Sequence, residues 1–175
     1  ACSLSEAGFQ TSILCSNEEI NTTFEGISIT GFDGNNLKKS EKITKLYEKI
    51  KKLNPDIIIC SEPLPVLAAN RYRRTNKHCK IIMDITEWYP EGYVAKVNGI
   101  KKYLYYVVQY LFNILMVNLA DSLIIGEETK KKRYDLITPF KRKEIIGYYP
   151  LLKDFHYSPP TFDGKTLTLC YAGIL

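Results

Sequence analysis

The chain has 175 residues, of which 45% are hydrophobic and 25% are charged. This composition predicts a folded domain with a full hydrophobic core and excludes a disordered chain. The formal net charge is +5, and the five cysteines are widely spaced, which argues against a disulfide framework or a zinc site. We therefore expect buried, reduced thiols in a cytoplasmic protein.

The first part of the chain predicts a helix end, two short strands and a basic helix. Residues 1–8 have the pattern of the second half of an amphipathic helix, so we expect the chain to be a piece of a larger protein. Apolar runs at Thr11–Ser16 and Ile27–Phe32 predict strands. Leu37–Leu53 predicts a helix, because its apolar residues recur at helical spacing.

This predicted helix carries seven lysines and two glutamates, a difference that equals the whole net charge of +5. Such lysines can simply cover a solvated helix face. They can also attract a phosphorylated ligand or an anionic membrane surface, and then we expect contact through Lys38, Lys39, Lys42 and Lys45. Nucleic acid is disfavoured as a partner, because aromatic residues do not alternate with these lysines on a predicted strand face.

The rest of the chain alternates between apolar strands and helices. Runs without polar alternation are typical of parallel strands covered on both faces. The succession predicts an α/β fold with a doubly wound, mostly parallel sheet and helices on both faces, as in Rossmann-like domains. We expect strands at 56–60, 80–85, 121–126 and 144–148, helices at 64–75, 100–120 and 128–136, and a loop at 86–92.

The helix at 100–120 contains an apolar segment, Tyr103–Leu119, which is at the short limit for a membrane span. Amide side chains interrupt this segment, and a span would break the alternation of strands and helices around it. We therefore expect a buried or partly membrane-facing helix. Its tyrosines, beside Lys101 and Lys102, suit the interfacial layer of a bilayer, so association with one leaflet is an open alternative.

Polar and acidic residues follow three of the expected strands directly. In a doubly wound sheet, ligands bind beyond the carboxyl ends of the strands. A carboxylate there can accept a proton from a hydroxyl nucleophile or hold sugar hydroxyls, and a tryptophan can stack on a sugar ring. The alternative is that the acids cap the following helices and the tryptophan belongs to the core. The candidate residues are Ser61, Glu62, Asp84, Thr86, Glu87, Trp88, Gly126 and Glu127.

Other chemistries have little support in the sequence. It contains no phosphate-binding glycine loop, zinc-protease helix, nucleophile elbow or paired-cysteine motif. We therefore expect neither a metal ion nor a cofactor bound by this chain.

Five segments occur in a characteristic order, which is more specific than any one of them. They are Leu53–Ala69, Lys80–Tyr93, Asn118–Lys132, Glu144–Phe155 and Leu167–Leu175. In this order they resemble the N-terminal half of a GT-B glycosyltransferase of family 4, of the type that builds bacterial polysaccharides. The first strand and its glycine-rich loop are missing from the pattern, and Gly126-Glu127 stands where Ser or Thr is usual.

The resemblance implies an acceptor-binding domain at 1–150, an interdomain linker at 151–165 and the first strand of a donor domain at 166–175. The acceptor would be a glycan or a lipid-linked sugar, and the nucleotide-sugar would bind to the second domain. Asp84 would be the catalytic residue near the reacting sugar, and the other candidates would bind the acceptor. The enzyme would work in the cytoplasm, at the inner face of the membrane, and this fragment alone would be inactive. The alternative is a non-catalytic α/β ligand-binding or response domain.

Overall fold

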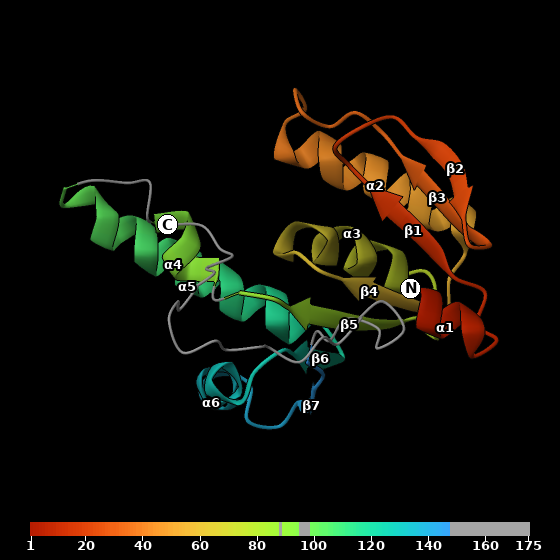
Figure 1. The fold of residues 1–175 in the computed structure, drawn as a ribbon. Helices are drawn as coiled ribbons and strands as arrows, with labels where there is room; N and C mark the ends of the chain where they lie inside the picture. The colour runs from red at the N-terminus through yellow and green to blue at the C-terminus, as the bar shows by residue number, and fades with distance from the viewer. Residues whose placement is uncertain (88, 95–98, 148–175) are drawn as a thin grey trace, which may run out of the picture.

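The computed structural model describes residues 1–87, 89–94 and 99–147. They form an α/β fold in which a mostly parallel sheet is flanked by helices, as in Rossmann-like domains (Figure 1). The predicted α/β class with a mostly parallel, Rossmann-like sheet flanked by helices is therefore confirmed. The predicted linker at 151–165 and the predicted strand at 166–175 lie outside the described residues, as does Trp88.

The N-terminal sheet follows the short helix α1 (Cys2–Glu6) and consists of β1 (Ser12–Cys15), β2 (Asn21–Phe24) and β3 (Ile27–Gly31). β3 lies in the middle, parallel to β1 and antiparallel to β2. The sequence pattern does not predict β2, because that segment is mostly polar. A two-residue turn at Glu25-Gly26 folds β2 onto β3, with positive φ at both positions, as tight hairpins require.

Helix α2 (Lys39–Leu53) packs between the N-terminal sheet and α3 (Pro63–Arg73) (Figure 1). Its buried residues, Leu46 and Ile50, share a hydrophobic cluster with Ala68 and Tyr72 of α3. α2 ends at Asn54, which adopts the left-handed conformation. The Asn54 side chain then accepts a 2.8 Å hydrogen bond from the Tyr72 hydroxyl, which fixes the end of α2 against α3.

The second sheet contains only parallel strands, in the order of the sequence. They are β4 (Ile57–Cys60), β5 (Lys80–Ile85), β6 (Ser122–Ile125) and β7 (Arg142–Ile145). Helices connect them: α3 follows β4, α4 (Tyr89–Val94) and α5 (Lys101–Leu119) follow β5, and α6 (Glu128–Ile137) follows β6. α4 occupies part of the segment where we expected a loop.

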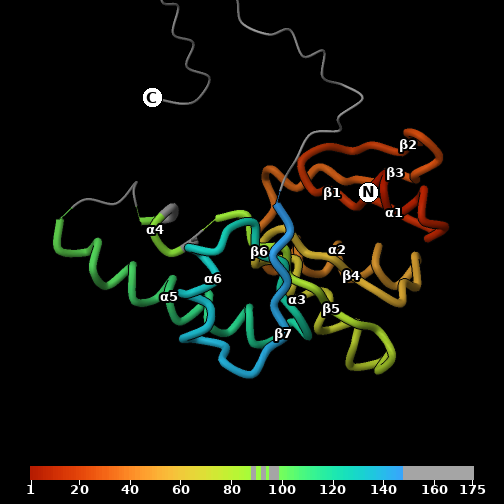
Figure 2. Tube along the Cα trace, turned by 60° about the horizontal axis from the view of Figure 1, so that its bottom comes forward, coloured from red at the N-terminus to blue at the C-terminus, as the bar shows by residue number. Residues whose placement is uncertain are grey.

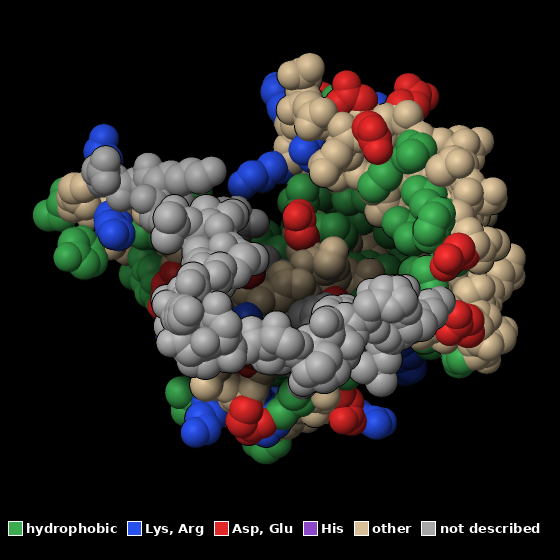
Figure 3. Space-filling model, viewed as in Figure 1, with side chains coloured by type: hydrophobic (Ala, Val, Ile, Leu, Met, Phe, Trp, Pro, Cys, Tyr) green, Lys and Arg blue, Asp and Glu red, His purple; other side chains and the backbone are tan. Residues whose placement is uncertain are grey.

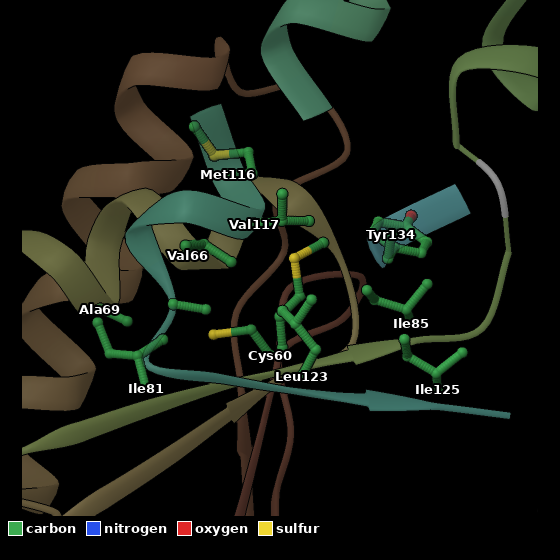
Figure 4. Packing of buried hydrophobic residues seen from close by; sticks show 12 residues of the cluster. Cys60, Val66, Ala69, Ile81, Ile85, Met116, Val117, Leu123, Ile125 and Tyr134 are labelled. Carbon is green, nitrogen blue, oxygen red and sulfur yellow. The ribbon is translucent and has the colours of Figure 1, made fainter. Parts of the chain in front are cut away.

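The main core lies on one face of this second sheet. Met83 of β5 and Leu123 of β6 pack there with Val66 of α3, Met116 of α5 and Tyr134 of α6, and all five are fully buried. Figure 4 shows the labelled strand side chains of this cluster on the same side of the strands as the labelled side chains of the helices. The three helices therefore cover one face through a shared core.

The opposite face of the second sheet is more open than the sequence predicts. The continuous apolar run of β4 predicts burial on both faces, but Ile57 and Ile59 are 52% and 46% exposed. β4 is an edge strand of the second sheet, and side chains alternate between its two faces. The two exposed isoleucines point away from the core that receives Cys60.

β7 begins two residues earlier than the apolar run at 144–148 predicts. The strand thereby includes Lys143, which pairs with the buried Leu123 and whose side chain is only 4% exposed. Its ammonium group donates hydrogen bonds to the backbone oxygens of Thr138 (2.6 Å) and Lys141 (3.2 Å) and pairs with Asp135 of α6 (3.1 Å). A buried lysine with three oxygen partners can thus occupy an inward position where the sequence pattern favours an apolar residue.

Helix α5 has two different halves. Its C-terminal half is buried at Asn113, Met116 and Val117, whereas its N-terminal half extends beyond the strands beside α4 (Figures 1 and 2). Among the described residues, the structure contains no helix that is both long and apolar enough to span a membrane.

Candidate functional site

The register of the parallel strands decides which candidate residues meet. Asp84 of β5 pairs with Ile124 of β6, and Ile85 pairs with Ile125. Thr86 and Gly126 come directly after this last pair, so they follow neighbouring strands at the same level. Ser61 follows Cys60, which pairs with Met83, one position before Asp84. The side of the sheet on which the strands end, here called the carboxyl edge, therefore brings these four candidates together.

Asp84 lies near the end of β5, on the face opposite the main core. Its neighbours in the strand, Met83 and Ile85, are fully buried under the helices, so alternation places the Asp84 side chain on the open face. The residue is half-buried there. A carboxylate in this position is accessible to a ligand and lies beside the end of β4.

The ends of β5 and β6 are connected by Lys130 of α6. Its ammonium group donates a 2.6 Å hydrogen bond to the backbone oxygen of Thr86 and forms a 3.6 Å ion pair with Glu127. Glu127 also accepts a 3.3 Å hydrogen bond from the Thr129 hydroxyl. The Glu127 side chain is 61% exposed and remains open to solvent beside these contacts.

Glu62 and Glu127 occupy the N-cap positions of α3 and α6, where the alternative interpretation, that these acids cap the following helices, places them. Neither side chain, however, makes a capping hydrogen bond to its helix. Glu62 and Glu87 are both exposed. They lie on different connections at the carboxyl edge, since Glu62 follows β4 and Glu87 follows β5.

Three charged residues at this edge were not among the candidates. Besides Lys130, Arg133 of α6 pairs with Glu91 of α4 at 3.1 Å, and both side chains are at least half exposed. The sequence pattern of α6 indicates only a solvated basic helix. The fold reveals their position, because α6 begins directly after β6 and directs its first turns toward the end of β5.

Cys60, which lies at the end of β4, has a thiol that is unsuited to nucleophilic chemistry. Burial, together with the nearby Cys79, raises the pKa of Cys60 to about 12. Its thiol is therefore protonated at neutral pH, and only a thiolate is an effective nucleophile. Within residues 1–87, 89–94 and 99–147, no three His, Cys, Asp or Glu side chains are arranged so that they could hold a metal ion.

The lysines predicted to contact a membrane lie at the start of α2. Lys38, Lys39 and Lys45 are exposed, Lys42 is half-buried, and the Lys45 ammonium lies 5.6 Å from the centre of the Phe32 ring. A shallow hollow of about 240 Å³ lies beside them. It is lined by Glu19, Gly31, Phe32, Lys45, Glu48, Lys49 and Lys52, so no candidate acceptor-binding residue contributes to it.

Comparison with known proteins adds no assignment: no protein-family model matches the chain, and no curated protein matches it significantly.

Proposed function

We propose that this chain is the acceptor-binding domain of a glycosyltransferase that moves a sugar from a nucleotide-sugar to a glycan or a lipid-linked acceptor. The observation that carries the proposal is the register of β4, β5 and β6, which gathers Ser61, Asp84, Thr86 and Gly126 at one carboxyl edge. The order of segments that resembles family 4 glycosyltransferases gives independent support. In this proposal, a second domain beyond Leu175 holds the nucleotide-sugar.

Asp84 has the chemistry that the acceptor side of such a reaction needs. An acceptor hydroxyl must lose its proton as it attacks the anomeric carbon of the donor, and a carboxylate within hydrogen-bond reach can accept that proton. Lys130 and Arg133 lie at the same edge, where they pair with the exposed carboxylates of Glu127 and Glu91. Where the phosphate of a lipid-linked sugar displaces these carboxylates, the two cations can donate hydrogen bonds to it.

Both domains are required for transfer, because catalysis depends on holding the acceptor hydroxyl against the donor sugar. The test uses the full-length protein with a short-chain polyprenyl-diphosphate sugar as acceptor and a set of radiolabelled nucleotide-sugars. Asp84→Asn is expected to lower the transfer rate by about 100-fold or more, as the loss of a general base does. The circular dichroism spectrum is expected to stay unchanged.

Glu128→Gln is the matched control, since Glu128 is an exposed acid at the same edge that has no proposed role. Its transfer rate is expected to equal that of the parent. Full activity of Asp84→Asn would remove Asp84 from the mechanism, and sugar transfer by residues 1–175 alone would contradict the need for a second domain. A continuation that lacks a nucleotide-sugar domain would favour the non-catalytic ligand-binding alternative.

A further inference from the structure

The exposed side of α5 carries a continuous apolar stripe. Its members recur at spacings of three and four residues, so they lie on one side of the helix and span about 140° of its circumference at 3.6 residues per turn. From Tyr103 to Leu115 they extend over about 18 Å along the helix. The stripe consists of Ile100, Tyr103, Leu104, Val107, Val108, Leu111 and Leu115, which are between 51% and 87% exposed.

The opposite side of α5 is anchored in the main core near its C-terminal end by Met116 and Val117, and the helix packs against α4 and α3. Tyr106 and Tyr110 stack on each other beside the stripe, with ring centres 6.2 Å apart. Figure 3 shows hydrophobic side chains, with basic groups beside them, at the projecting end of α5.

We propose that this stripe is a membrane-docking surface that inserts shallowly into an anionic bilayer. The charge of the helix fits this partner, because Lys101–Leu119 contains two lysines and no acidic residue. Lys101 borders the stripe at its N-terminal end, where an ammonium group can reach lipid phosphates while the apolar residues enter the acyl region.

A protein partner fits the stripe less well. Protein interfaces make about one hydrogen bond for every 100–200 Å² of buried area. Tyr103 is the one stripe residue with a polar side-chain group, so the stripe offers few such bonds. The hydrocarbon of a bilayer needs no hydrogen bonds from the stripe. A tyrosine at the end of an apolar stripe is also typical of the layer between acyl chains and headgroups.

This inference is independent of sugar transfer, although a membrane-bound surface would suit a lipid-linked acceptor. It also differs from contact through the lysines of α2, because the proposed binding energy comes mainly from apolar residues. The two models predict different effects of mutation.

The experiment measures the binding of the chain to vesicles of phosphatidylcholine, with and without phosphatidylglycerol, by co-sedimentation. The double variant Leu104→Gln, Leu111→Gln is expected to lower the partition coefficient about tenfold or more, since it removes two large side chains from hydrocarbon. The control, Leu136→Gln with Phe140→Gln, removes apolar residues that are 84% and 100% exposed but lie outside the stripe. Its binding is expected to equal that of the parent. Lys101→Gln with Lys102→Gln is expected to weaken the preference for phosphatidylglycerol.

A second measurement tests insertion directly. Lipids brominated on their acyl chains are expected to quench the tryptophan fluorescence of Leu104→Trp more than they quench that of the parent, which contains only Trp88. The fluorescence of Leu136→Trp is expected to show no such additional quenching. The proposal is overturned if the parent binds neither kind of vesicle, or if the double variant of the stripe binds as the parent does. It is also overturned if only charge-removing variants of the α2 lysines abolish binding. A parent that forms dimers in light scattering, which the stripe variant loses while vesicle binding persists, would identify a second copy as the occupant.

Discussion

In the second sheet, the amino edge, where the strands begin, is built differently from the carboxyl edge, where they end. At the amino edge, Asp121 accepts hydrogen bonds from the backbone of Ile81 (2.7 Å) and from Arg73 (2.9 Å), and Arg73 also donates to the backbone of Leu119 (3.0 Å). These bonds connect α3, β5 and the junction of α5 with β6. At the carboxyl edge, Lys130 contacts Thr86 and Glu127, Arg133 pairs with Glu91, and both of these glutamates remain exposed.

This difference separates stability from function. At the amino edge, Asp121 and Arg73 bridge three elements through bonds of 2.7–3.0 Å, two of them to backbone groups, so these polar residues stabilise the fold. The carboxyl edge leaves its carboxylates accessible, which costs little stability because exposed charges remain hydrated. Polar residues at the two edges should therefore respond differently to substitution.

The largest effect is expected for Asp121→Ala. This change removes the ion pair with Arg73 and leaves the Ile81 amide without its acceptor, so the free energy of unfolding should fall by about 2–3 kcal/mol. Urea unfolding followed by circular dichroism measures it. Asp121→Asn keeps an oxygen acceptor and should lose less. A loss for the alanine variant no larger than that for Glu127→Ala would remove the distinction between the edges.

A smaller, pH-dependent effect is expected at Asp135. The hydrogen bond from Lys143 in particular, together with Lys131, lowers the pKa of Asp135. Because its folded pKa lies below its unfolded pKa, the stabilisation is present above the usual aspartate pKa of about 4 and is lost as the pH falls through the folded value. Asp135→Asn should therefore be less stable than the parent near neutral pH, and the two should converge in acid. Parallel pH profiles of unfolding would contradict this expectation.

Glu127→Ala should change stability by less than about 1 kcal/mol, because its ion pair with Lys130 is solvent-exposed. The same thermal or urea unfolding experiment measures it, with Glu128→Ala as the control on the same helix end. If Glu127 instead proves as important for stability as Asp121, the carboxyl edge has a structural role that the exposure of its acids does not suggest.

The smallest effect is expected when the folded chain is treated with a thiol reagent, because Cys60 should not react. Burial raises the pKa of its thiol to about 12, so iodoacetamide at about pH 8 should leave it unmodified in the folded chain. Unfolding in urea should make it react, and mass spectrometry of peptides locates the label. Rapid labelling in the folded state would show that the end of β4 opens.

The predicted strands at 80–85 and 121–126 and the basic helix match β5, β6 and α2 closely, because their patterns of apolar residues are long and regular. The sequence was less informative for β2, whose polar residues lack such a pattern, and for β7, where Lys143 replaces an apolar residue. It also identified Asp84 and Glu127 as strand-end residues, but Lys130 and Arg133 resembled an ordinary solvated helix face. The assignment of Asp84 and the acceptor-binding residues to sugar transfer stays a prediction.

By itself, the sequence determined the alternation of strands and helices, since burial of apolar side chains follows the local period of each element. Only the tertiary structure decided which residues meet. Strand register set Thr86 and Gly126 at the same level, and helix packing brought Lys130 to both strand ends and left the apolar stripe of α5 exposed beside the other described elements. The physical reason is that register and packing arise from contacts between residues far apart in the chain, for which local periodicity carries no signal.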